Sequence, residues 1–137
     1  NQTPTAPTSL LVNGVANNPR VNDADPAFSA IYNDPNQYDL SNYYEIEVNT
    51  NDTFTGTVMW DSGQQYMSTT TQGARSPNIT YNGSTLNLEG VTYYWRIRFW
   101  DAANAVSPWA TGSFKTAGSY TTFQNIQFGG GVSFSNP

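Results

Sequence analysis

The chain contains neither cysteine nor histidine, and these two absences exclude much of protein chemistry. Without cysteine it forms no disulfide and has no thiol nucleophile, and without either residue the common zinc ligands are missing. Histidine is also the usual general base and the central member of a Ser-His-Asp triad. Any catalysis would therefore depend on carboxylates alone, and no cofactor is expected.

Charged side chains and long apolar runs are scarce as well. Charged residues are 11% of the chain, against about 25% in ordinary soluble domains. Only five are Lys or Arg and the net charge is −5, which disfavours a nucleic-acid partner because phosphate binding needs clustered cations. No apolar run approaches the ~20 residues of a membrane-spanning helix. We therefore expect no nucleic acid, no membrane insertion and, from the Asn- and Thr-rich surface, an extracellular protein.

What the chain does contain is a series of short runs with strand character, separated by turn residues such as Asn82-Gly83. The 137 residues suffice for one domain. Short strands at regular spacing predict an all-β, antiparallel two-sheet sandwich. We expect an extended leader at 1–7, the sandwich at 8–116 and a tail at 117–137. Strands are expected at residues 9–15, 28–32, 43–49, 57–60, 78–81, 85–88, 93–100 and 112–116.

The run 93–101 alternates strictly, which is the period of a half-buried strand. One parity is bulky and suits a core, whereas the other places Arg96 and Arg98 between aromatic residues. The run 43–48 has the same design with Glu45 and Glu47 on its outward parity. If the two strands are neighbours, each Glu faces an Arg as a cross-strand ion pair, which favours one register. The inward parity of 93–101 consists of Tyr93, Trp95, Ile97 and Phe99, and the outward parity of Tyr94, Arg96, Arg98 and Trp100.

Several runs together resemble a known family, the fibronectin type III-like (immunoglobulin-like) module of secreted prokaryotic surface proteins, which also accompanies glycosidases such as α-L-rhamnosidases. The resemblance covers roughly residues 7–116. It implies a Greek-key sandwich in which the 43–48 and 93–101 strands are adjacent, and a corner formed by Leu88 and Tyr93. The runs that carry it are PAFSAIY at 26–32, YYEIEV at 43–48, VMWDSG at 58–63, YYWRIRFWD at 93–101 and SPW at 107–109.

The tail at 117–137 has no charged side chain. Apolar residues alternate on both sides of a Gly-Gly-Gly hinge, which predicts two short neutral strands. Such a segment seeks a sheet edge, either on its own domain or on a neighbouring subunit as a donated strand. The anchors of that subunit interface would be Phe123, Ile126, Phe128, Val132 and Phe134.

Two functional hypotheses follow, and neither is enzymatic. The leading one is an extracellular structural protein, a subunit of a pilus-like surface filament or array that polymerises with itself by strand addition. The alternative is a carbohydrate-binding or adhesive accessory module of a secreted or surface protein. In that case Tyr94, Trp100 and Trp109 are the candidate sugar-binding aromatics. The sequence favours a competing interpretation of these rings, in which they stack on Arg96 and Arg98 and rigidify the sheet.

Carboxylates in the loops raise the questions of metal binding and catalysis. Asp23, Asp25, Asp34 and Asp39 resemble calcium ligands in type, but no D-x-D-x-D-G loop is present and Asp before Pro is also a turn residue. With Asp61 and Glu89, these are the only conceivable glycosidase acids. Nothing in the pattern brings two of them to the separation of ~5–10 Å that glycoside hydrolysis requires. We therefore predict no metal site and no catalytic residue.

Four Asn residues begin N-x-S/T triplets in the leader or in expected turns and strand ends, where a glycan could be accommodated. Such triplets also arise by chance in a chain rich in Asn and Thr. The chain starts with Asn rather than Met, which fits removal of a signal peptide or trimming. The glycosylation candidates are Asn1, Asn51, Asn78 and Asn82.

Overall fold

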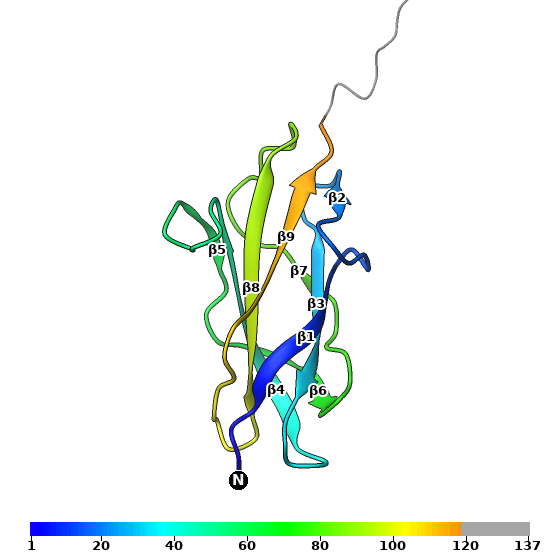
Figure 1. Cartoon of the computed structure of the whole chain (residues 1–137), viewed down its shortest axis with the longest axis vertical. Helices are drawn as coiled ribbons and strands as arrows, with labels where there is room; N and C mark the ends of the chain where they lie inside the picture. The colour runs from blue at the N-terminus through cyan, green and yellow to red at the C-terminus, as the bar shows by residue number, and fades with distance from the viewer. Residues whose placement is uncertain (119–137) are drawn as a thin grey trace, which may run out of the picture.

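Short strands with alternating buried and exposed side chains make up the computed structural model, which describes residues 1–118 (Figure 1). Alternation is expected where each sheet covers a core with one face and meets solvent or loops with the other. The strands are β1 (Thr5–Val12), β2 (Arg20–Val21), β3 (Ala27–Asn33), β4 (Leu40–Asn49), β5 (Val58–Asp61), β6 (Gln65–Thr71), β7 (Ile79–Thr80), β8 (Thr92–Asp101) and β9 (Ala110–Thr116).

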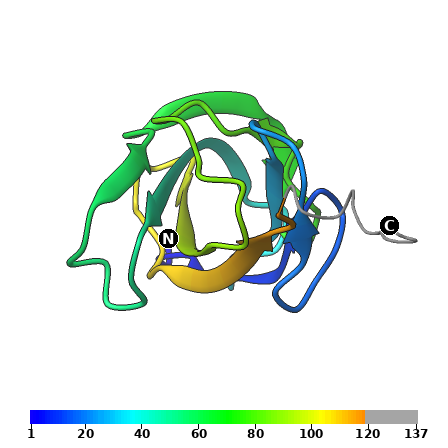
Figure 2. The same cartoon turned by 90° about the horizontal axis from the view of Figure 1, so that it is seen from above.

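The strands form two sheets that face each other and wrap around a common core (Figure 2). The smaller sheet has the order β1-β3-β7. The larger has the order β2-β9-β8-β4-β5, and β6 pairs with β4 as well. All pairs of these strands are antiparallel except β2 with β9. The prediction of an all-β two-sheet sandwich is confirmed, and residues 1–118 contain no helix long and apolar enough to span a membrane.

Aromatic rings fill the space between the sheets. Phe28 of β3 lies at the centre, with ring centroids 4.6 Å from Trp95 of β8 and 5.9 Å from Phe114 of β9. Further along β3, the ring of Tyr32 packs edge-to-face against that of Phe99, with a centroid distance of 5.9 Å. All five side chains are at most 1% exposed. Tilted and edge-to-face ring pairs are the preferred arrangements, so this core is both apolar and specifically packed.

Four elements differ from the sequence-based expectation. β1 begins at Thr5, inside the expected leader, and a bulge near Ser9 (φ 52°) interrupts its pairing with β3. β2 and β6 were not anticipated, since β2 has two residues and β6 (QYMSTTT) is a largely exposed, polar edge strand. The expected strand at 85–88 is wrong. The backbone of Asn87 bonds to side chains instead of to a strand: Asn87 N donates to the Tyr93 hydroxyl, and the Thr116 hydroxyl donates to Asn87 O.

The sandwich is elongated, and the chain enters and leaves it at opposite ends. Residue 1 lies at one end of the long axis, whereas β9 runs toward the other end, where residue 118 lies (Figure 1). The tail strands expected within 117–137 fall almost entirely outside the described residues. Ala117 and Gly118 are described, and neither belongs to a strand.

Candidate functional site

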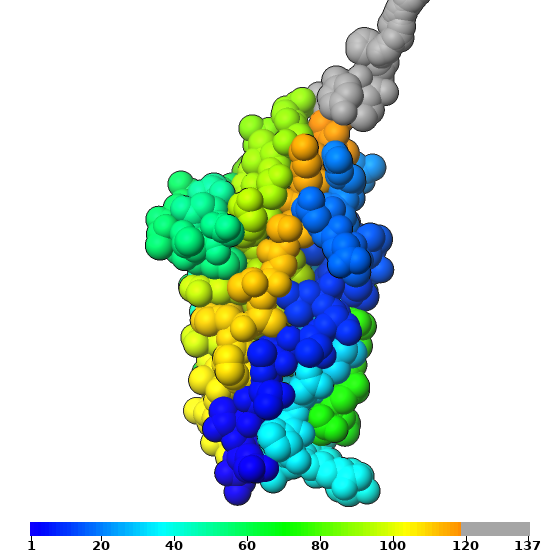
Figure 3. All heavy atoms as spheres, viewed as in Figure 1, coloured from blue at the N-terminus to red at the C-terminus, as the bar shows by residue number. Residues whose placement is uncertain are grey.

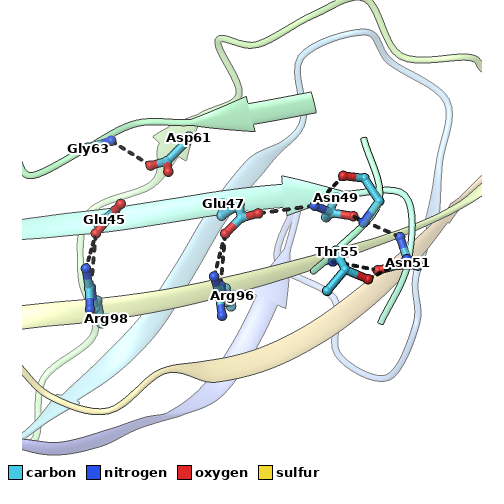
Figure 4. A network of polar contacts seen from close by, with 10 residues as sticks. Glu45, Glu47, Asn49, Asn51, Thr55, Asp61, Gly63, Arg96 and Arg98 are labelled. Atoms are coloured by element: carbon cyan, nitrogen blue, oxygen red, sulfur yellow. Dashed lines mark hydrogen bonds and ion pairs between the residues drawn. The ribbon is translucent and has the colours of Figure 1, made fainter. Parts of the chain in front are cut away.

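The outer face of β8 carries the two ion pairs that the alternation predicted (Figure 4). β4 and β8 pair with Glu45 opposite Arg98 and Glu47 opposite Arg96. In both pairs Nε and Nη2 of the Arg donate to the same Glu oxygen, at 3.0 and 2.7 Å. The Glu side chains are only 12% and 7% exposed, and the Arg side chains 29% and 28%. The pairs are therefore more sheltered than the exposed ladder that the sequence suggested.

Aromatic rings lie between and beyond the two guanidinium groups. Arg96 is 4.5 Å from the ring centroid of Phe54 and 4.3 Å from that of Trp109. Arg98 is 4.2 Å from Trp109 and 5.3 Å from Trp100. Since alternate residues of a strand are about 7 Å apart, the indole of Trp109 lies between the two cations. We call the series Phe54, Arg96, Trp109, Arg98 and Trp100 the Arg–aromatic stack.

This stack includes two of the three aromatic residues that were candidates for sugar binding, Trp100 and Trp109. The ring of Trp109 is in contact with the guanidinium groups of both Arg96 and Arg98. Trp100 is only 9% exposed, and Tyr94 is half-buried on the same strand. A pyranose needs an open ring face for stacking, and Trp109 does not offer one. The arrangement matches the interpretation in which these rings rigidify the sheet.

A hydrogen-bond network holds the loop that supplies Phe54. Asn49, fully buried at the end of β4, donates through Nδ2 to Glu47 at 3.2 Å. Its Oδ1 accepts the backbone N–H groups of Asn51 and Gly56, both at 3.1 Å. The ion pair is thereby linked to the loop that places Phe54 (φ 59°) over Arg96. Nothing in the sequence distinguishes Phe54 from any other loop residue, so its role was missed.

The two ion pairs differ in their acidic surroundings. Burial raises the pKa of Glu45, and the neighbouring Asp61 carboxyl raises it further, while Arg98 opposes both effects. Asp61 also accepts the backbone N–H of Gly63 at 3.0 Å. Glu45 therefore lies close to a second carboxyl group, that of Asp61. Glu47 instead accepts hydrogen bonds from Arg96 and from the neutral amide of Asn49.

Three carboxylates gather at the end of the sandwich near residue 1. Oxygens of Asp34, Asp39 and Asp101 lie within 4.8 Å of one another, and Asp34 and Asp101 are buried. Sequence reasoning had raised the first two for calcium but had not placed any two acids this close together, and it had not considered Asp101. Each buried carboxylate accepts a backbone hydrogen bond within its own turn: Asn36 N donates to Asp34 and Ala103 N donates to Asp101. Asp34 also accepts a hydrogen bond from the Tyr32 hydroxyl. The same burial and the neighbouring acids raise the pKa of Tyr32.

The remaining carboxylates that the sequence raised do not join this group. Asp23 accepts a hydrogen bond from Asn13 beside the start of β3, at 3.2 Å. Asp61 is the last residue of β5 and lies near Glu45, and Asp25 and Glu89 are exposed loop residues. The three carboxylates of the cluster come from segments far apart in the chain.

The glycosylation candidates are unequal in their surroundings. Asn1, Asn78 and Asn82 are exposed. The side chain of Asn51 is committed to its loop, since Nδ2 donates to Thr55 at 3.2 Å and Oδ1 accepts Thr55 N at 3.0 Å. The interface residues expected in the tail lie outside the described residues, namely Phe123, Ile126, Phe128, Val132 and Phe134.

Comparison with known proteins identifies relatives of the domain. A family model described as "Rha78A-like, N-terminal immunoglobulin domain" matches residues 7–120. No curated protein sequence matches the chain. The family match covers the whole sandwich, including the Arg–aromatic stack and the carboxylate cluster.

Three solved structures show the same fold. An α-L-rhamnosidase of Dictyoglumus thermophilum superposes with a TM-score of 0.69 at 23% identity, over 82% of this chain and 12% of that one. The Streptomyces avermitilis α-L-rhamnosidase complexed with L-rhamnose gives 0.68 at 24% identity, over 82% and 10%. The PKD domain of an M14-like peptidase from Thermoplasmatales archaeon SCGC AB-540-F20 gives 0.53 at 16% identity, over 85% and 97%. The chain thus spans only about a tenth of each rhamnosidase.

Proposed function

This chain belongs to the family of Rha78A-like N-terminal immunoglobulin domains, and from that premise we propose that it serves as a non-catalytic accessory domain of a secreted glycoside hydrolase. The observation that carries the proposal is the family match over residues 7–120. The two rhamnosidases whose fold it shares support it further, and they point to rhamnose-containing glycans as the substrate of the whole enzyme.

The disposition of the acids supports a non-catalytic role. Glycoside hydrolysis by two carboxylates needs an acid and a base or nucleophile on either side of an accessible sugar-binding cleft. Among residues 1–118, Glu45 and Glu47 are tied to arginines on the outer sheet. Asp34 and Asp101 are at most 5% exposed and accept hydrogen bonds from their own turns. These acids are committed to holding the domain together.

The Arg–aromatic stack supports a mechanical rather than a chemical role. It stiffens the outer face of the larger sheet, so that both faces of β8 are packed. A stiff sandwich is suited to holding a neighbouring domain in a fixed orientation. An extracellular location is part of this proposal, on the ground of the scarce charge and the Asn- and Thr-rich composition of the chain. The filament hypothesis gains no support from the relatives and stays a prediction about the tail.

Hydrolysis by the chain itself is the first test. The purified protein is incubated with 4-nitrophenyl α-L-rhamnopyranoside and with a panel of other aryl glycosides. We expect release of nitrophenol at the rate of buffer alone, because none of the described acids faces a substrate cleft. Release above that rate that disappears in Asp101→Asn or Asp34→Asn would overturn the non-catalytic assignment.

A domain exchange tests the accessory role directly. The segment of the Dictyoglumus thermophilum rhamnosidase that superposes on this chain is either deleted or replaced by this chain. We expect deletion to lower the melting temperature and activity of the enzyme, and replacement to restore a large part of both. The PKD domain, which shares the fold but not the family, is the matched control and should restore neither. If the PKD domain restores as much as this chain does, the proposal fails.

A further inference from the structure

A groove on the opposite side of the sandwich from β5 and β6 has the features of a ligand site. It lies between β1, the loop 13–19 and the first residues of β9 (110–113), and these segments are neighbours on the face shown in Figure 3. Its volume is about 780 Å³, which is within the range of about 300–1,000 Å³ typical of small-molecule sites. β1 and β9 lie side by side here, but β1 pairs only with β3 among the described strands, so the sandwich is open along this edge.

A buried donor lies at the floor of this groove. Trp95 is only 1% exposed and lines the groove. Among residues 1–118, none accepts a hydrogen bond from its indole N–H. Buried polar groups are satisfied in roughly 90% or more of cases, because leaving one unpaired is costly. An exception of this kind beside a cavity points to an acceptor that is bound from outside.

Gly112 lets the indole of that donor pack against β9 at the groove, since both residues line it. β8 and β9 pair with Trp95 opposite Gly112. A Cβ atom at residue 112 would lie 2.9 Å from the indole Nε1 and 3.5 Å from a methyl group of Leu10. The indole nitrogen therefore packs directly against the backbone of Gly112, with Leu10 beside it. Any larger residue would disturb this contact.

The lining indicates the chemistry of the ligand. None of the described residues around the groove is charged, so an ion would bury its charge unpaired at a high cost. The rim is made of hydroxyl and amide groups, and the Ser113 hydroxyl orients the Asn18 side chain by donating to its Oδ1 at 3.2 Å. Apolar residues including Leu10 and Val15 complete the walls. A neutral molecule with several hydroxyls and an apolar C–H face fits this combination.

The edges of the groove favour a compact ligand over an added strand. On the β9 side, residues 110–114 lie outside the pairing with β2, which involves Lys115 and Thr116, and Lys115 N donates to Pro19 O at 3.0 Å. On the β1 side, the bulge at Ser9 distorts the facing edge. An added strand needs a regular row of main-chain donors and acceptors, which the edge of β1 does not provide.

We propose that the groove over Gly112 binds a neutral saccharide of one or two rings, with a sugar oxygen accepting the hydrogen bond of the Trp95 indole. The choice of a sugar among neutral hydroxylated ligands rests on the proposed role in a glycoside hydrolase. The site is separate from the Arg–aromatic stack, since Trp95 points inward from β8 whereas Arg96 and Arg98 point outward.

Proton–nitrogen NMR of the full chain tests this proposal, because the four tryptophans give four indole signals. The Trp95 signal is assigned by its loss in Trp95→Phe. L-Rhamnose, a rhamnose disaccharide and D-galactose are the neutral probes, and D-galacturonate is the charged counterpart of galactose. We expect a saturable downfield shift of the Trp95 indole proton with a neutral probe, and roughly tenfold weaker binding of galacturonate.

Variants separate the groove from other surfaces. Gly112→Ala places a methyl group against Nε1 and should abolish the shift, while the other three indole signals show that the fold is retained. If Gly112→Ala does not fold, the rim variants Asn18→Ala and Thr111→Val should weaken binding several-fold. Ser68→Ala, an exposed serine at a different groove, is the matched control and should change nothing.

Any one of three results would overturn the proposal. The first is a Trp95 signal that does not move with any of the neutral probes. The second is a movement of the Trp100 or Trp109 indole signals in its place, and the third is a galacturonate that shifts the Trp95 signal as readily as galactose does. None of these outcomes bears on the accessory role, which is decided by the stability and activity of the exchanged rhamnosidase.

Discussion

The two faces of β8 are packed in different ways. On the inner face, Trp95, Ile97 and Phe99 are at most 1% exposed and meet apolar neighbours. On the outer face, Arg96 and Arg98 are held by one carboxylate each and by the rings of the Arg–aromatic stack. Apolar burial contributes about 25 cal/mol per Å² without regard to direction. A cation–π contact contributes about 0.5–2 kcal/mol, and only where the geometry is right.

The difference shows how a polar surface can be made rigid without becoming apolar. The inner face needs shape and volume, so it should tolerate a similar apolar residue better than a void. The outer face needs matched partners, so it should be sensitive to the loss of one charge or one ring. The substitutions that follow, in order of decreasing effect, test this contrast.

The largest effect is expected from Phe28→Ala on the inner side. The ring contacts Trp60, Trp95 and Phe114, and its loss should lower the free energy of unfolding by about 3–5 kcal/mol. Urea unfolding followed by tryptophan fluorescence measures the change. Val58→Ala, at a side chain that is 50% exposed, is the control, with an expected change within about 0.5 kcal/mol. Equal losses in the two variants would contradict this account of the core.

Trp109→Ala should give the largest effect on the outer face, about 1–3 kcal/mol, because both guanidiniums lose a ring at once. Phe54→Leu is the milder companion. It removes a single ring from Arg96 and keeps apolar volume, so we expect a loss of about 0.5–1 kcal/mol. The same unfolding experiment compares them. If Trp109→Ala is as stable as the parent protein, the Arg–aromatic stack does not contribute to the free energy of unfolding.

A double-mutant cycle on Glu47 and Arg96 isolates the ion pair from the rings. With Glu47→Gln, Arg96→Gln and the double variant, we expect a coupling energy of about 1 kcal/mol, larger than for most exposed pairs because the Glu side chain is only 7% exposed. The coupling should persist when salt is raised, since sheltered pairs are screened little. A coupling that vanishes at high salt would place this pair among ordinary surface contacts.

The smallest effect concerns the pH dependence that Glu45 confers. Its pKa is raised above 4.5 by burial and by Asp61, so its contribution to stability is complete below that pH and is lost as the pH rises through the folded-state value. Asp61→Asn keeps an acceptor for Gly63 N but removes the charge. It should reduce this loss and stabilise the protein at neutral pH by less than about 1 kcal/mol.

Unfolding free energies of the parent and of Asp61→Asn, measured from acidic to neutral pH, decide the point. Asp52→Asn, an exposed acid in the β4–β5 loop, is the matched control for a general change in net charge. A gain at neutral pH that is equal in both variants would show that the effect is not specific to Glu45.

Sequence reasoning succeeded where the information was local. Strict alternation identified which side chains of β8 face inward. The family resemblance implied that β4 is its neighbour, and the charges of Glu45 and Glu47 then predicted ion pairs with the two arginines of β8, which the structure contains. It failed where distant loops meet. Phe54 reaches Arg96 through a loop held by Asn49, and no periodicity marks such a residue. β6 was missed because an exposed edge strand lacks the apolar alternation that reveals a half-buried one.

The carboxylate cluster and the groove were missed for the same reason. Asp101 meets Asp34 because the turn after β8 and the turn after β3 lie at the same end of the sandwich. Trp95 was correctly assigned to the core by its parity. The environment of its indole N–H depends on how the unpaired edges of β1 and β9 lie beside each other. The arrangement of two sheet edges cannot be read from a single sequence.

The placement of residues 1 and 118 at opposite ends of the long axis has a mechanical consequence (Figure 1). A load between the two ends would pull β1 and β9 along their own lengths, in opposite senses. The antiparallel hydrogen bonds between β1 and β3 would then be strained together in shear and not opened one by one. A domain pulled from these two ends should therefore resist extension. The force at which it unfolds in an optical trap should be set by the β1–β3 hydrogen bonds and the bulge that interrupts them.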